Sequence, residues 1–131
     1  MDKEVIVLDK EVIVLDTDRT QCENLCTLLA DAKYKAIPMD SISEMNEYVG
    51  DKNCRALIVD LDNTSVNNII FRDLKKIKPM INIIAISERQ FHPELAEALR
   101  DQINVCLKKP IDPDDLIYWM KSIFENSSNK K

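Results

Sequence analysis

The sequence predicts an α/β fold in which helices cover both faces of a parallel sheet. Two observations lead to this prediction. Short apolar runs recur along the 131 residues, and each is continuous rather than alternating, as in strands that are buried on both faces. A stretch with the apolar spacing of a helix follows each run, and such alternation is typical of a doubly wound sheet. The length suits one domain.

Five runs are predicted as strands. The four strongest are VIVL at 12–15, ALIV at 56–59, INIIAI at 81–86 and NVCL at 104–107. The fifth, YKAIPM at 34–39, contains Pro38, which has no amide hydrogen to donate to a second neighbouring strand. We therefore expect this run at an edge of the sheet.

Helices are predicted between the strands and after the last one. Ser41 with Glu44 three residues on is a capping-box pattern, and Asp112 followed by Pro113 is typical of a helix start. The predicted ranges are 19–32, 42–49, 66–77, 93–101 and 113–125.

The chain contains one glycine, although the turns of such a fold usually need residues with positive φ. Asparagine tolerates this region better than most residues. Asn63, Asn67 and Asn68 are therefore the predicted substitutes for glycine.

Composition narrows the classes of protein and partner. A net charge of −5 argues against nucleic-acid binding by bulk charge. No apolar run approaches the roughly 20 residues that span a bilayer, and the acidic start lacks the pattern of a secretion signal. Four cysteines without an exported context predict free thiols in a reducing cytoplasm. Cys22 and Cys26 share a helical stripe with two leucines, which favours a core position over a metal site.

The heptapeptide DKEVIVL occurs at residues 2–8 and again at 9–15. Only the second copy runs into Asp16, so we expect residues 11–15 to form the first strand. Residues 1–10 are then a duplicated extension, in which Val5 to Leu8 project from the sheet, either disordered or paired with a second molecule. The alternative is that the exact repeat is a cloning or recent duplication accident without function. The domain is predicted over 11–125, with a polar tail at 126–131.

Polar side chains follow the strands at the edge where a doubly wound sheet carries its chemistry. They are Asp16, Thr17 and Asp18 after the first strand, Asp60 and Asp62 after the third, Ser87 after the fourth and Lys109 after the fifth. Clustered carboxylates repel one another unless a cation lies among them, and Mg²⁺ prefers oxygen ligands. A lysine and a hydroxyl beside such a carboxylate would suit a phosphoryl group. Each residue also has a local explanation, and Asp18 could simply cap the next helix.

Four segments, VIVLDTD, ALIVDLD, IIAIS and CLKKPIDPDDL, resemble the receiver domains of two-component response regulators. The resemblance covers about residues 11–125, and we expect a flavodoxin-like (βα)5 fold with strand order 2-1-3-4-5. It implies that Asp60 accepts a phosphoryl group from a phosphohistidine, with Ser87 and Lys109 holding the oxygens. The implied magnesium ligands are Asp16, Asp60, the backbone carbonyl of Asp62 and, if the loop is rearranged, Asp18.

The sequence departs from the receiver pattern at several positions. Thr17 stands where receivers usually carry a second acid, so magnesium binding is predicted to be weak. Glu88 replaces a residue that is usually small, and Cys106 stands at the position of an aromatic switch residue.

Two other functions fit parts of the pattern. A degenerate receiver that is never phosphorylated would act as a protein-binding module, and Thr17, Glu88 and Cys106 favour it. VDLDNTS at 59–65 also resembles the first motif of haloacid-dehalogenase phosphatases, with Asp60 as nucleophile and Asp62 as general acid. That motif normally lies on the first core strand, whereas here a βαβα unit precedes it.

As a receiver, the chain would catalyse at most its own phosphorylation and dephosphorylation.

The expected partners are a histidine kinase or phosphotransfer protein upstream and a protein target downstream. No nucleic-acid or membrane partner is expected, and self-association would involve the duplicated extension. The resemblance to receivers implies that the fourth and fifth predicted helices and the fifth strand form the docking surface for partners. Tyr118 and Trp119 lie off the apolar stripe of the last helix, so at least one should be partly exposed.

Overall fold

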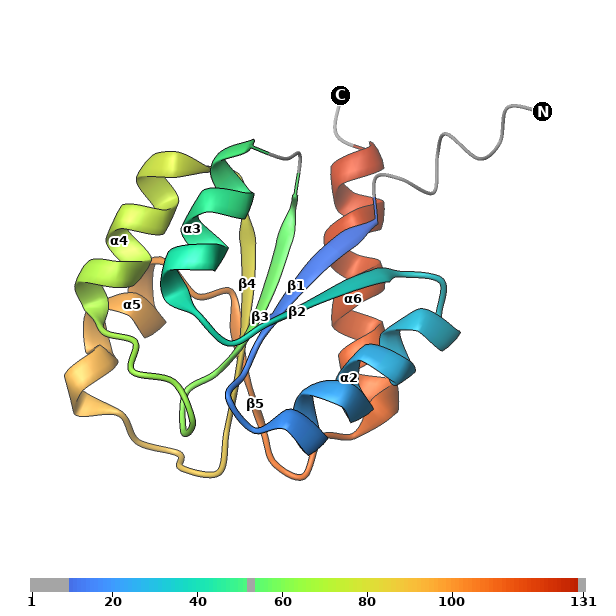
Figure 1. Ribbon diagram of the computed structural model, residues 1–131, viewed down its shortest axis with the longest axis horizontal. Helices are drawn as coiled ribbons and strands as arrows, with labels where there is room; N and C mark the ends of the chain where they lie inside the picture. The colour runs from blue at the N-terminus through green and yellow to red at the C-terminus, as the bar shows by residue number, and fades with distance from the viewer. Residues whose placement is uncertain (1–9, 52–53, 130–131) are drawn as a thin grey trace.

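The computed structural model describes residues 10–51 and 54–129 of the chain and contains one parallel sheet (Figure 1). Its strands lie in the order β2-β1-β3-β4-β5, which confirms the predicted flavodoxin-like topology. Lys35–Met39, the strand with Pro38, lies at an edge as predicted. The strands are β1 Glu11–Leu15, β2 Lys35–Met39, β3 Ala56–Asp60, β4 Asn82–Ser87 and β5 Val105–Lys108.

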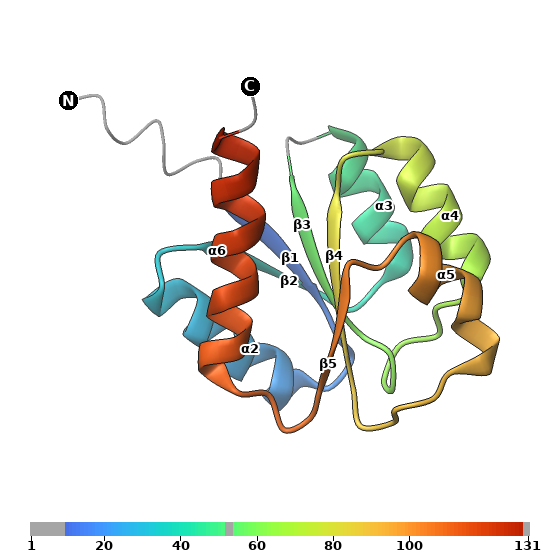
Figure 2. The same cartoon turned by 180° about the vertical axis from the view of Figure 1, so that it is seen from behind.

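Helices cover both faces of the sheet. Two of them, α2 and α6, lie on one face, whereas α3, α4 and α5 lie on the other (Figures 1 and 2). The last helix continues to Asn129, beyond the predicted end at 125. The bounds are α2 Arg19–Asp31, α3 Ile42–Asp51, α4 Asn68–Ile77, α5 Ala96–Asp101 after a 3-10 turn η1 Pro93–Leu95, and α6 Pro113–Asn129.

Two hydrophobic cores hold the layers together, one on each face of the sheet. Successive residues of β1 alternate between them, so that Ile13 packs beneath α3 and α4 while Val12 and Val14 pack beneath α2 and α6. All three side chains are fully buried, which explains why the strand sequence is continuously apolar. The burial fixes the register of β1, because a shift by one residue would exchange the two faces.

The second copy of the duplicated heptapeptide supplies β1, as predicted. Leu15 ends the strand and Asp16 follows directly at its carboxyl end. The first copy, including Val5 to Leu8, lies outside the described residues. In the next helix, Cys22 is buried with Leu25 and Leu29, and Cys26 packs partly buried against the same core, which confirms the predicted core stripe.

The positive φ angle expected of an asparagine belongs to Lys33 instead. Lys33 has a φ of 74°. Among residues 10–51 and 54–129, it is the only non-glycine residue with a positive φ. It follows α2 in a Schellman motif, in which the Tyr34 amide donates to the Leu29 carbonyl at 2.9 Å and the Lys33 amide to the Ala30 carbonyl at 2.9 Å. The prediction for the asparagines was wrong, and Asn67 instead caps α4 through its side chain.

Replacing Lys33 with glycine should raise the free energy of unfolding by about 0.5–1 kcal/mol. Glycine relieves the cost of the left-handed conformation, and its greater freedom in the unfolded chain offsets part of that gain. Lys33→Ala is the matched control, because alanine removes the same side chain and keeps a Cβ atom. Urea denaturation of both variants tests this, and a glycine variant no more stable than the alanine variant would contradict it.

Candidate functional site

Four of the predicted site residues meet at the carboxyl edge of the sheet, at its lower end in Figure 1. Asp60 and Ser87 are the last residues of β3 and β4, while Asp16 and Lys109 directly follow β1 and β5. Asp16, Asp60 and Ser87 are 3%, 0% and 0% exposed, and the Lys109 side chain is 10% exposed. The site is therefore polar but largely withdrawn from solvent.

Asp60 is surrounded by hydrogen-bond donors. Its Oδ1 accepts from the backbone amides of Asp62 at 2.8 Å and Asn63 at 3.2 Å. Its Oδ2 accepts from Lys109 Nζ at 2.8 Å, from Asn63 Nδ2 at 2.8 Å and from Gln21 Nε2. Burial by itself would raise the pKa of Asp60, but these hydrogen bonds outweigh it and hold the pKa below the ordinary value. Asp60 is thus ionised at neutral pH despite its burial.

Lys109 joins two carboxylates. Its Nζ lies 2.8 Å from Asp60 Oδ2 and 3.1 Å from Asp62 Oδ2. Burial lowers the pKa of Lys109, but its hydrogen bonds and attraction to Asp60 and Asp62 outweigh this effect and raise it. The ammonium group is therefore a fixed positive charge in the site.

The Asp62 carboxylate faces the ends of β4 and β5 and not Asp16. Ser87 Oγ donates to its Oδ1 at 2.7 Å, and the Glu88 backbone amide donates to its Oδ2 at 2.7 Å. Burial raises the pKa of Asp62, but the hydrogen bonds from Glu88, Ser87 and Lys109 lower it below the ordinary value. Asp62 is an anion held by three donors.

The residues after Asp16 organise the loop into α2. Asp18 accepts a hydrogen bond from the Gln21 backbone amide at 3.1 Å and is the N-cap of α2. This is the helix-capping role that the sequence offered as a local explanation of Asp18. Thr17 donates its hydroxyl hydrogen to the Asn63 carbonyl. Asp18 is therefore engaged at the helix start, and its part in a metal site remains a prediction.

Gln21 is a site residue that the sequence analysis missed. Its Nε2 donates to Oδ2 of both Asp16 and Asp60, so a neutral amide lies between two carboxylates. The spacing of Asp18 and Gln21 matches a capping box, which would turn the glutamine back onto the Asp18 amide. Asp16 Oδ1 accepts that amide at 2.9 Å instead, and this leaves Gln21 free to turn inward.

Asp16 and Asp60 provide ligands that fit a magnesium ion. Both turn Oδ2 toward one point, now held by Gln21 Nε2, and carboxylate oxygens are the ligands that Mg²⁺ prefers. Burial and the charge of Asp60 raise the pKa of Asp16, although hydrogen bonds from Gln21 and the Asp18 amide oppose the rise. No group of three or more His, Cys, Asp or Glu side chains suited to a metal ion occurs in the described part of the chain. The fit to the ion therefore rests on two carboxylates, those of Asp16 and Asp60.

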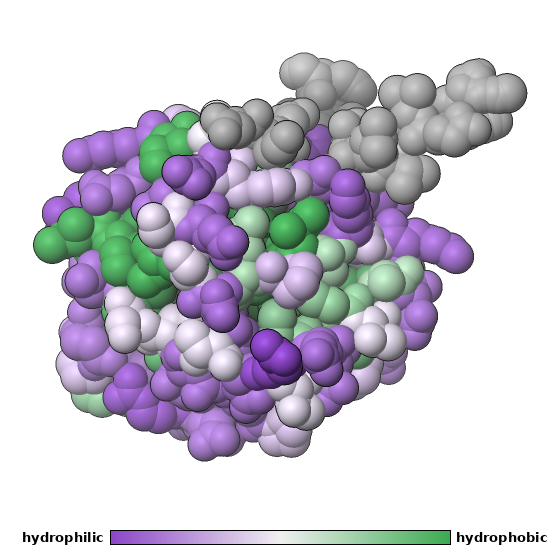
Figure 3. Space-filling view, viewed as in Figure 1, coloured by the Kyte–Doolittle hydropathy of each residue, from purple (hydrophilic) through white to green (hydrophobic). Residues whose placement is uncertain are grey.

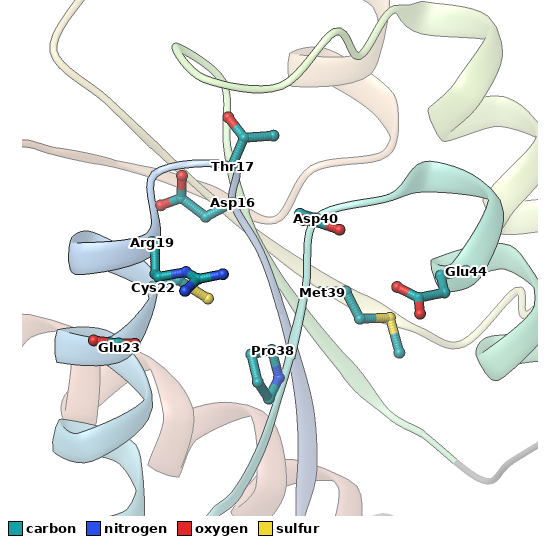
Figure 4. A pocket seen from close by; sticks show the side chains of 9 residues that line it. All are labelled: Asp16, Thr17, Arg19, Cys22, Glu23, Pro38, Met39, Asp40 and Glu44. Carbon is teal, nitrogen blue, oxygen red and sulfur yellow. The ribbon is translucent and has the colours of Figure 1, made fainter.

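A pocket of about 390 Å³ lies beside this cluster, between α2 and the segment from β2 into α3 (Figure 4). Asp16 and Thr17 lie at one end, and Arg19 extends toward Pro38 and Asp40. Asp60 is not among its lining residues. The pocket is therefore a neighbour of the carboxylate site and not the space in front of Asp60.

The sequence matches the family described as response regulator receiver domain over residues 12–121. This chain belongs to that family. The match favours a receiver over the phosphatase alternative, and a comparison with curated proteins gives no match.

Solved structures share the receiver fold. A CheY-like receiver domain protein from Methanospirillum hungatei JF-1 has a TM-score of 0.82 at 14% identity, covering 93% of this chain and 98% of that one. The signal receiver domain of an HD domain-containing protein from Pseudomonas fluorescens Pf-5 has a TM-score of 0.81 at 15% identity, covering 92% and 98%. NtrX from Brucella abortus has a TM-score of 0.76 at 20% identity, covering 92% of this chain and 27% of that one.

The surface of the receiver carries several exposed apolar side chains. Tyr118 is 64% exposed and stacks edge-on against Trp119, which confirms that at least one of the two is exposed. Ile69 and Ile77 are exposed on α4, where Figure 3 shows an apolar area on the same side of the molecule. None of the helices within the described ranges is long and apolar enough to span a membrane.

Lys109→Met should lower the free energy of unfolding at pH 7 by about 2–3 kcal/mol, because two carboxylates lose a charged hydrogen-bond donor. The lowered pKa values of Asp60 and Asp62 mean that their contribution to stability is present at neutral pH and is lost as the pH falls through those values. The difference between wild type and variant should therefore shrink below about pH 4.

Lys108→Met is the matched control for this experiment, since Lys108 is exposed at the end of β5 and should change stability by less than about 0.5 kcal/mol. Chemical denaturation at several pH values measures both variants. Equal losses in the two variants, or a Lys109 effect independent of pH, would contradict the prediction.

Proposed function

We propose that this receiver relays a signal by accepting a phosphoryl group on Asp60 from a phosphohistidine of a histidine kinase or phosphotransfer protein. The observation that supports the proposal most is a buried Asp60 carboxyl group whose Oδ2 lies 2.8 Å from Lys109 Nζ. A carboxylate that is already ionised needs no base to become a nucleophile. The four free cysteines support a cytoplasmic location for this reaction.

The chain's own residues would act on different parts of the reaction. As a bond forms between phosphorus and an Asp60 oxygen, the phosphorus–nitrogen bond breaks and the imidazole leaves with the bonding electrons. Lys109 would neutralise charge on the transferred oxygens, while the Ser87 hydroxyl and the Glu88 amide would donate hydrogen bonds to them. Mg²⁺, held by Asp16 and Asp60, would supply further charge neutralisation.

Acetyl phosphate should label the wild-type receiver with one phosphoryl group in the presence of Mg²⁺, and acetate leaves as the acyl phosphate bond breaks. Asp60→Asn should take no label, because the amide is not a nucleophile. Intact-mass measurement after incubation distinguishes the two. Labelling of Asp60→Asn would place the acceptor elsewhere. A wild-type chain that takes no label would favour the alternative of a protein-binding module that is never phosphorylated. The observation that supports this alternative is that Asp60 Oδ2 already accepts hydrogen bonds from Gln21, Asn63 and Lys109.

Magnesium should bind weakly to the wild-type receiver and about tenfold more tightly to Gln21→Ala. The Gln21 amide now lies between the two carboxylates, so an ion must displace it. Thr17→Asp should also tighten binding, because it adds a carboxylate to the same loop. Titration of amide chemical shifts near Asp60 measures the affinity without any phosphoryl transfer.

Asn24→Ala is the control for the magnesium titration, since it removes an exposed amide from the same helix. It should leave the affinity unchanged. Binding that survives Asp60→Ala unchanged, or is equally weak in Gln21→Ala and wild type, would show that the ion does not take the place of the amide.

A further inference from the structure

Three donors from separate parts of the edge converge on the Asp62 carboxylate. They are the Ser87 hydroxyl at 2.7 Å, the Glu88 backbone amide at 2.7 Å and Lys109 Nζ at 3.1 Å. A hydroxyl, a backbone amide and an ammonium group are the donors that hold phosphoryl and other oxyanions. The Asp62 side chain is 20% exposed, so these protein donors replace much of the water that would surround a surface carboxylate.

These donors lie beside the oxygen that would carry the phosphoryl group. Lys109 Nζ contacts both Asp60 Oδ2 and Asp62 Oδ2, so one ammonium group links the nucleophile to the neighbouring carboxylate. Ser87 ends β4, the strand that pairs with β3, and Asp60 lies opposite Ile86 in that pairing. A phosphoryl group on Asp60 would therefore extend its oxygens toward the donors that Asp62 now occupies.

We propose that Asp62 is an internal competitor for the phosphoryl group, and that its carboxylate holds Ser87, Glu88 and Lys109 until the phosphoryl group displaces it. This inference rests on the proposed function and identifies Asp62 as a residue that slows the phosphorylation of Asp60. Asp62 lies in the turn after β3, outside both cores, so its side chain can rotate into solvent while the sheet stays in place. Removal of the competitor leaves the donors open to the incoming oxygens.

Asp62→Ala should be labelled by acetyl phosphate about tenfold faster than wild type, the equivalent of one charge-assisted hydrogen bond that no longer has to be broken. Asp62→Asn should behave in the same direction with a smaller gain, because one amide oxygen still accepts. Removal of any negative charge near the site would reduce the repulsion of acetyl phosphate, which is an anion, and could by itself speed labelling. Asp40→Asn controls for this effect, since Asp40 is an exposed acid that follows β2 at the same edge.

The amide resonance of Glu88 provides a measurement that does not depend on labelling. In wild type its hydrogen bond to Asp62 should hold the proton downfield, and in unlabelled Asp62→Ala the resonance should move upfield. Labelling of the variant should return it downfield as a phosphoryl oxygen replaces the carboxylate. Thermal unfolding of each variant confirms that the comparison is between folded chains.

The outcomes separate this inference from the proposed function. Faster labelling of the Asp62 variants than of Asp40→Asn supports the competitor. Equal or slower labelling of Asp62→Ala, or an unmoved Glu88 resonance, overturns it while Asp60 remains an acceptor. If no variant is labelled but the Glu88 resonance shifts in Asp62→Ala, the carboxylate does hold these donors and phosphoryl acceptance by Asp60 is what fails.

Discussion

The burial of an ionised carboxylate at the end of a central strand is the constraint around which the functional edge of this receiver is organised. Asp60 has no exposed surface, and an unpaired charge in such a place would be neutralised or would destabilise the fold. The chain meets this requirement with a lysine, two side-chain amides and two backbone amides. Their segments must therefore meet at one point, and the two cores are what bring them there.

The two cores are apolar and the carboxyl edge of the sheet is charged, but the position of the edge residues depends on the packing of the cores. Apolar packing on both faces holds β1, β3, β4 and β5 in register, so that the residues after each strand end side by side. The same alignment buries Asp16 and brings it toward Asp60, so burial raises the pKa of Asp16 and repulsion from Asp60 adds to the rise. Some stability is thus given up at the edge, as is common where a protein carries its chemistry.

Three polar side chains of the edge, Thr17, Gln21 and Asp62, form a connected arrangement. Thr17, in the place of an acid, donates to the Asn63 carbonyl and ties the first loop to the loop after β3. Gln21 places hydrogen atoms where two carboxylates would otherwise face each other. Asp62 accepts from the groups on the far side of Asp60. The charges and donors of this edge are therefore paired with one another, and an incoming ion or phosphoryl group would have to displace Gln21 or Asp62 from them.

Much of the fold and part of the site could be predicted from sequence because they rest on local patterns. Continuous apolar runs identified the strands, Pro38 identified an edge, and the positions directly after the strands brought Asp16, Asp60, Ser87 and Lys109 to one edge. Strand ends of a parallel sheet converge whatever the side chains do there. The duplicated heptapeptide was likewise resolved by position, since only its second copy leads into Asp16.

The tertiary structure alone decided where the polar side chains of that edge point. Gln21 reaches Asp60 across 39 positions of sequence and Lys109 across 49, and no local pattern specifies such partners. The spacing from Asp18 to Gln21 predicts a capping box, but a buried carboxylate in need of donors is a stronger partner than the helix end. The left-handed turn at Lys33 brings Tyr34 into the same core as Leu29, and the Tyr34 amide donates to the Leu29 carbonyl. Sequence determined which groups lie at the edge, and the need to satisfy buried charges determined how they are paired.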